Sequence, residues 1–150
     1  RLLAGAVSGS PFDALYVIVN TNKYGGGGIY NYYGLSMSDH QTSKEVFVHE
    51  FGHSFAGLAD EYYNSEVAYI EMYPLDVEPW EPNITTLVDF GSKWEDMMDT
   101  EGVGLHEGAA YMAKGIYRPA PDCRMHTNLA PAFCPVCRRA VEKMIDYYTK

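Results

Sequence analysis

The sequence predicts one domain of the α+β class, in which a small mixed sheet packs with two long helices. A β-branched and aromatic run at residues 14–20 predicts a buried strand, and the aromatic stretch at residues 29–38 predicts one or two more. Residues 43–56 predict a first helix, and residues 135–148 predict a closing helix. Because 150 residues is the length of one ordinary domain, we assign residues 1–150 to a single unit.

A glycine run follows the first predicted strand. Residues 24–28 read YGGGG, and four consecutive glycines cannot hold a helix and weaken a strand. The segment is therefore either a flexible connection or a place where another backbone comes close.

The boundaries of the first helix rest on two local signals. Thr42 and Glu45 have the spacing of a capping box, and Gly57 is a natural helix end. Residues 73–82 carry three prolines and predict an irregular loop, whereas residues 105–114 predict a short helix. The closing helix has a proline in its first turn and one apolar face. That face consists of Val136, Ala140, Val141, Met144, Ile145 and Tyr148.

Charge and hydropathy argue against nucleic-acid binding and against a membrane-spanning segment. A net charge of -9 would repel the phosphates of nucleic acid, so we expect no nucleic-acid binding. No apolar stretch approaches the roughly 18–20 residues of a membrane span, so we expect none in this chain. Residues 1–9 read like the tail of a helix and lack an initiator Met. We therefore expect a further segment of the protein upstream.

The three cysteines leave several readings open. Cys134 and Cys137 have the spacing of half a zinc knuckle, but a closed structural site needs four ligands and there is no second pair. A redox motif is the second reading. The third reading is one local disulfide between Cys123 and one of the other two, which suits an exported protein.

The residues that carry chemistry begin at His49-Glu50-Phe51-Gly52-His53, which has the pattern HExxH. Residues four apart on a helix project to one side, so His49 and His53 can bind one metal ion. Zinc takes nitrogen ligands at roughly 2.0–2.1 Å and leaves one position to water in catalytic sites. Glu50 can then reach that water as a general base without being a ligand.

A third ligand is needed to complete such a site. Asp60 would lie about 16 Å beyond His49 along the axis if the helix continued, which is too far to share an ion. The backbone must therefore turn back, and Gly57 can adopt the positive φ that such a turn needs. We favour Asp60 as the third ligand, and Glu61 is the alternative.

The segment HEFGHSFAGLADEY resembles the zinc signature of the metzincin peptidases, in which a Gly ends the HExxH helix and a His or Asp follows three residues later. Three residues precede Gly57 where the usual signature has two. The resemblance implies a Met-turn beneath the metal, and Met125 occupies the corresponding place before the closing helix. Thr127 stands where some metzincins have a tyrosine that contacts the metal.

More narrowly, the chain resembles the immunoglobulin A peptidases among the metzincins. The shared segments, in order, are Val19-Asn20-Thr21, Tyr24-Gly25-Gly26, His49 to Tyr62, Arg118-Pro119, Cys123-Arg124-Met125 and Phe133 to Cys137. The resemblance implies a zinc endopeptidase that is secreted or bound to the bacterial surface and acts on protein substrates. It also implies that the opening strand and helix of a metzincin domain are missing from residues 1–150.

The substrate is expected to bind along an edge strand close to the glycine run. Tyr24, Gly25 and Gly26 would pair with it through the backbone, and Glu107 would line the cleft. The rival hypothesis is a carbohydrate- or protein-binding module with a structural or vestigial zinc site. The 13 tyrosines and the acidic loops suit that rival, whereas the retained Glu50 favours the enzyme.

Overall fold

The structure is a computed structural model and describes residues 5, 8–63 and 72–150. The prediction of a helix tail at residues 1–9 falls largely outside these residues. The described part confirms an α+β fold with two sheets and two α-helices. None of the described helices is both long and apolar enough to cross a membrane.

The first half of the chain forms a mixed three-stranded sheet. Strands β1 (Tyr16–Val19), β2 (Gly26–Ile29) and β3 (Tyr33–Met37) are arranged in the order β1-β3-β2. β1 runs parallel to β3, whereas β2 runs antiparallel to it. The glycine run is therefore part of an edge strand and not a flexible connection.

The prediction that β1 is buried is wrong. Ile18 and Val19 are 62% and 41% exposed. β1 is an edge strand that packs mainly on β3, while helix α2 contacts β2 and β3. Its apolar side chains consequently have little to cover them within the described part of the chain.

Helix α2 (Ser43–Ala56) has the predicted bounds, but its N-terminus is built differently. The capping box does not form, because Thr42 makes no side-chain bond to the helix. Its hydroxyl instead lies 2.9 Å from the Nδ1 atom of His40, whose carbonyl accepts a bond from the Ser43 hydroxyl. At the other end Gly57 has a φ of 64°, as predicted, and ends the helix in a left-handed cap.

The second half of the chain is irregular apart from a hairpin and the closing helix. Its elements are η1 (Phe90–Ser92), η2 (Glu95–Met97), β4 (His106–Ala109), β5 (Met112–Arg118) and α3 (Pro135–Thr149). Residues 73–82 form no helix or strand, as predicted.

The predicted short helix at residues 105–114 is wrong, because β4 and β5 form an antiparallel hairpin there. Ala110 and Tyr111, with φ values of 50° and 63°, form its two-residue turn. The backbone N–H groups of these turn residues donate to the carbonyls of Asp60 and Tyr62, at 2.9 and 3.1 Å. These tertiary bonds outweigh the helical propensity of the segment.

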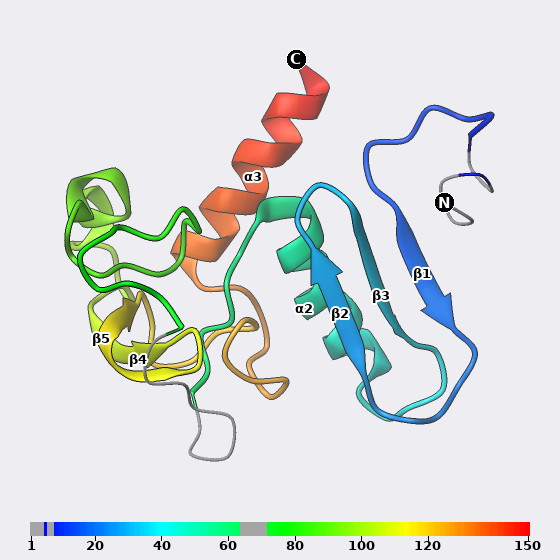
Figure 1. Cartoon of the computed structure of the whole chain (residues 1–150), viewed down its shortest axis with the longest axis horizontal. Coiled ribbons are helices and arrows are strands. Elements are labelled where there is room, and N and C mark those ends of the chain that lie inside the picture. The colour runs from blue at the N-terminus through cyan, green and yellow to red at the C-terminus, as the bar shows by residue number, and fades with distance from the viewer. Residues whose placement is uncertain (1–4, 6–7, 64–71) are drawn as a thin grey trace.

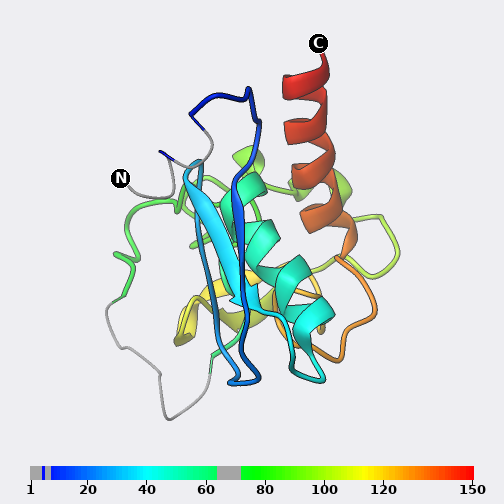
Figure 2. The ribbon, with the colours of Figure 1, turned by 90° about the vertical axis from the view of Figure 1, so that its right-hand side faces the viewer.

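The elements pack around α2. The three-stranded sheet lies along one side of this helix, and α3 rises on another side (Figures 1 and 2). The hairpin and the irregular segments form the rest of the molecule. A buried cluster that includes Trp94, Met125 and Val136 joins α2, α3 and the loop before α3. It fixes the position of α2 relative to the loop that passes beneath it.

Candidate metal centre

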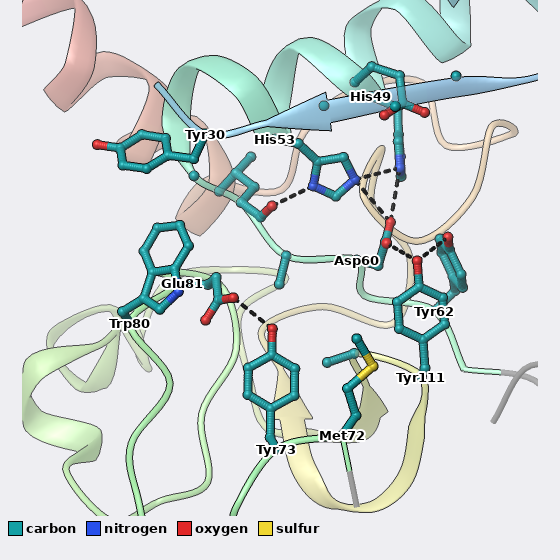
Figure 3. Close-up of a pocket in the computed structure, with 18 residues that line it drawn as sticks. Tyr30, His49, His53, Asp60, Tyr62, Met72, Tyr73, Trp80, Glu81 and Tyr111 are labelled. Atoms are coloured by element: carbon teal, nitrogen blue, oxygen red, sulfur yellow. Dashed lines mark hydrogen bonds and ion pairs between the residues drawn. The ribbon is translucent and has the colours of Figure 1, made fainter. Parts of the chain in front are cut away.

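Two imidazoles and one carboxylate meet beside α2. His49 and His53 project from the same side of the helix, and their Nε2 atoms lie 3.1 Å apart. The Oδ1 atom of Asp60 lies 3.0 Å from the Nε2 atom of His49 and 3.1 Å from that of His53 (Figure 3). The side chains are only 11–15% exposed. Asp60 would lie far from both histidines if the helix continued, but the turn after Ala56 brings it next to them.

The outer bonds of the two imidazoles fix which ring nitrogen faces this point. The Nδ1 atom of His49 lies 2.9 Å from the carbonyl of Arg124, and that of His53 lies 2.6 Å from the carbonyl of Leu58. A carbonyl only accepts, so both Nδ1 atoms must be donors. In the neutral form both Nε2 atoms then present lone pairs to each other and to the Asp60 carboxylate. Three electron-pair donors facing one another need a cation between them.

The spacing of these three atoms fits a metal ion. A triangle with sides of 3.0–3.1 Å has a point roughly 2 Å from every corner, about 1 Å out of its plane, as zinc–nitrogen and zinc–oxygen bonds require. His49, His53 and Asp60 would hold the ion, and the remaining position would stay open.

The turn at Gly57 delivers Asp60 and a network of bonds holds it. Asn83 brackets the segment, because its side chain accepts from the N–H of Ala59 at 2.7 Å and donates to the carbonyl of Ala59 at 2.9 Å. The Tyr111 hydroxyl donates to the second carboxylate oxygen of Asp60. Burial alone would raise the pKa of Asp60. In their protonated form, however, the two imidazoles donate hydrogen bonds to this carboxylate, and these bonds outweigh burial and hold the pKa well below its usual range.

Glu50 lies next to the two imidazoles without belonging to the triangle. One carboxylate oxygen lies within 4.8 Å of ligand nitrogens of His49 and His53. Burial raises the pKa of Glu50, although the neighbouring imidazoles oppose the rise. A carboxylate with a raised pKa beside a metal position suits a general base.

Glu61, the alternative third ligand, points elsewhere. Its side chain is completely buried, and its Oε1 atom accepts from Asn83 at 2.9 Å and from the thiol of Cys137 at 3.0 Å. The geometry therefore places Asp60, and not Glu61, against the imidazoles.

Met125 lies directly beneath the helix that carries the imidazoles. It is fully buried, and a Cβ atom added to Gly52 would lie 2.8 Å from its sulfur. Its backbone carbonyl accepts from the N–H of Glu61 at 2.8 Å. The preceding carbonyl, that of Arg124, holds His49. The turn at Met125 thus supports one imidazole and the segment that carries the third ligand.

A cavity of about 400 Å³ opens beside the three ligands. Tyr30 and Trp80 form an aromatic wall, with ring centroids 5.2 Å apart (Figure 3). At the far side Tyr73 donates to the buried carboxylate of Glu81 at 2.6 Å. Tyr111 also lines the cavity, and its hydroxyl lies 2.9 Å from that of Tyr62. None of these side chains was predicted to line a cavity, because only Tyr62 belongs to a motif and the others lie on loops or turns without one.

The glycine run crosses above the site. A Cβ atom at Gly26 would lie 2.5 Å from a carboxylate oxygen of Glu50, and one at Gly28 would lie 2.4 Å from the carbonyl of Glu50. The close neighbour is therefore α2 of the same chain. Tyr24 and Gly25, with Gly26, line a second cavity of about 330 Å³ that also reaches His49. Two cavities thus adjoin His49 and Glu50, and the glycine run contributes to the lining of both.

The placement of Glu107 differs from the prediction. Its carboxylate binds the ammonium of Lys114 at 2.8 Å and the N–H of Gly115 at 3.1 Å. It is not among the residues that line either cavity beside His49. The carboxylate stabilises the β4–β5 hairpin itself, because the residues first read as one helix fold back on each other.

Of the three readings that the cysteines left open, the local disulfide does not form, since Cys123, Cys134 and Cys137 are free thiols. All three are buried, and their sulfurs gather around the carboxylate of Glu61. The three thiols and the Glu61 carboxylate therefore form one buried group of four polar side chains.

Two histidines and a carboxylate around an open metal position, with a second carboxylate alongside, define the site of a metal-dependent hydrolase. The model of the family described as IgA Peptidase M64 matches residues 1–102 and 99–145. The chain therefore belongs to this family of metallopeptidases. No curated protein matches the chain.

Proposed function

We propose that the protein is a zinc-dependent endopeptidase in which His49, His53 and Asp60 hold the metal. The observation that carries this proposal is the set of three lone-pair donors within 3.0–3.1 Å of one another, each held by an outer hydrogen bond. The membership of a peptidase family supports it further. Nothing in the described residues favours a purely binding module.

The metal ion and the side chains would have separate roles in hydrolysis. A zinc ion, when bound, supplies Lewis acidity that polarises a peptide carbonyl and lowers the pKa of water. Glu50 accepts the proton of the attacking water and passes it to the nitrogen of the leaving amine. Asp60 and the backbone carbonyls of Leu58 and Arg124 keep both imidazoles oriented throughout.

The substrate is proposed to extend along β2. Within the described residues the outer edge of this strand is unpaired, since β2 is the last strand of the sheet. An extended peptide can add to such an edge through backbone hydrogen bonds. Its side chains would then enter the two cavities that His49 helps to line, one lined also by Tyr30 and Trp80 and the other by Tyr24. Immunoglobulin A or another extracellular protein is the proposed substrate, and the enzyme would be secreted or held at the cell surface.

The substitution Glu50→Gln tests this mechanism. The variant should bind zinc as tightly as the unchanged protein and lose roughly 100-fold or more of its turnover, because it removes the proton acceptor and not a ligand. Cleavage of immunoglobulin A and casein would be followed with chelator and after zinc is restored. Glu107→Gln is the matched control and should keep full activity. Full activity of Glu50→Gln would remove Glu50 from the mechanism.

A further inference from the structure

A second group of metal-binding side chains lies behind the proposed catalytic site. Cys123, Cys134, Cys137 and Glu61 each offer one ligand atom, and these four atoms lie within 4.8 Å of one another. Cys134 directly precedes α3 and Cys137 lies in the first turn of this helix, while Cys123 lies two residues before Met125 in the preceding loop. Segments far apart in the sequence thus contribute to one cluster.

The four side chains of the cluster are almost completely shielded from water, so solvent cannot satisfy their polar groups. Glu61 and Cys137 are 0% exposed, Cys123 is 1% exposed and Cys134 is 7% exposed. Thiols alone are common in cores. A carboxylate among them is not, because burying it without a partner is strongly unfavourable.

One oxygen of Glu61 is left without a partner. Its Oε1 atom accepts from the amide of Asn83 at 2.9 Å and from the thiol of Cys137 at 3.0 Å. Its Oε2 atom is buried and has no hydrogen-bond partner among the residues that the structure describes. A buried carboxylate that lies among three sulfurs and has one oxygen without a partner is the arrangement expected when a cation completes the group.

The spacing and type of the ligands indicate which cation. In a tetrahedral zinc site with bonds of about 2.3 Å to sulfur, neighbouring ligand atoms lie roughly 3.5–3.8 Å apart, within the 4.8 Å limit of this cluster. Thiolates select zinc over calcium and magnesium, which prefer oxygen. The N–H of Cys134 also donates to the sulfur of Cys123 at 3.2 Å, so the backbone at the start of α3 holds two of the sulfurs close together.

We propose that Cys123, Cys134, Cys137 and Glu61 bind a second, structural zinc ion. Binding forms three sulfur–zinc bonds and one oxygen–zinc bond and releases the thiol protons to solvent, without any change of oxidation state. Four protein ligands leave no open position, so this ion would take no part in hydrolysis.

The position of this site gives it a role in building the catalytic one. Glu61 directly follows Asp60, and its N–H donates to the carbonyl of Met125 at 2.8 Å. Cys123 precedes by one residue Arg124, whose carbonyl holds His49. A zinc ion bound to Glu61 and Cys123 would therefore fix the segment that carries the third catalytic ligand against the turn that orients an imidazole.

Metal analysis of the whole chain tests the proposal. The purified protein, loaded with zinc and freed of loosely bound metal, should hold two zinc ions per chain and three reduced cysteines. The double variant His49→Ala/His53→Ala should retain one zinc ion. Cobalt in that variant should give the thiolate-to-cobalt charge-transfer absorption, which the proposed catalytic ligands cannot produce. These results would support the second site independently of any peptidase activity.

Single substitutions then identify the ligands. In the double-variant background, Glu61→Gln should weaken zinc binding by more than the roughly 10–100-fold that changes outside the ligand shell cause, whereas Glu107→Gln should leave it unchanged. If the unchanged protein held only one zinc ion and the double variant held none, the proposal would be overturned. A disulfide between any two of the cysteines in the unreduced protein would also overturn it. Because the double variant keeps all four ligands of the second site, this test does not require any cysteine variant to fold.

Discussion

The hydroxyl of Tyr111 donates to Asp60 on the side away from the imidazoles, so removing it should weaken metal binding without removing a ligand. Tyr111→Phe deletes that bond and the contact with the Tyr62 hydroxyl at 2.9 Å. Bonds of this kind orient a metal ligand, and their loss typically costs about 10–100-fold in metal affinity. That range corresponds to about 1.4–2.7 kcal/mol.

The assay is competition for zinc with a chelating dye, at constant pH. Tyr73→Phe is the matched control, because its hydroxyl lies in the same cavity but donates to Glu81. It should leave zinc affinity unchanged, while Tyr111→Phe weakens it. Equal affinities for Tyr111→Phe and the unchanged protein would show that Asp60 is not held in place for the metal.

Three further predictions concern packing and protonation. Gly28→Ala would put a carbon 2.4 Å from the carbonyl of Glu50 and should lower the free energy of unfolding by about 1–3 kcal/mol, whereas Gly27→Ala meets nothing within 4 Å and should not. Met125→Ala should cost about 2–5 kcal/mol and Met125→Leu less than about 1.5 kcal/mol, both measured in urea, with Met125→Leu keeping its zinc. A loss of zinc from Met125→Leu would contradict a packing role.

The third of these predictions concerns how zinc affinity depends on pH. Burial lowers the pKa of His53, but its bond to Asp60 outweighs this and leaves the pKa raised. Because protons compete with zinc for the imidazole, zinc affinity should fall as the pH drops through this raised pKa, by about tenfold per pH unit for each competing proton. Calorimetric titrations from about pH 8 to about pH 5.5 would measure it, and a flat profile would contradict it.

Local patterns in the sequence were sufficient for the helix that carries the site. The positions of α2 and of the closing helix follow from residue spacing, and the end of α2 follows from Gly57, although the capping box expected at its start does not form. The convergence of Asp60 with His49 and His53 was also expected, since a straight helix could not bring the three together. These features depend on residues close in the sequence.

Features that depend on distant residues were not predictable in the same way. The β4–β5 hairpin exists because its turn binds the segment around Asp60, and this pairing has no local signal. The aromatic wall of Tyr30 and Trp80 joins two loops about fifty residues apart. The glycines of β2 were read as room for a substrate, whereas α2 is what approaches Gly26 and Gly28.

The cysteines show the same limit. Counting cysteines alone gave three candidate ligands and no fourth, which argued against a closed metal site but left that reading open. The fold supplies the fourth ligand group from Glu61, which the sequence analysis had considered only as a partner of His49 and His53. A ligand set that mixes residue types and distant segments is visible only once the chain is folded.

The central claim is that His49, His53 and Asp60 share one zinc ion. Anomalous X-ray diffraction from crystals of the zinc-loaded protein, recorded on both sides of the zinc absorption edge, tests it most directly. The account predicts a zinc peak about 2 Å from the Nε2 atoms of both histidines and from the Oδ1 atom of Asp60. An ion bound to the two imidazoles through Glu61, or no zinc between these side chains, would contradict it.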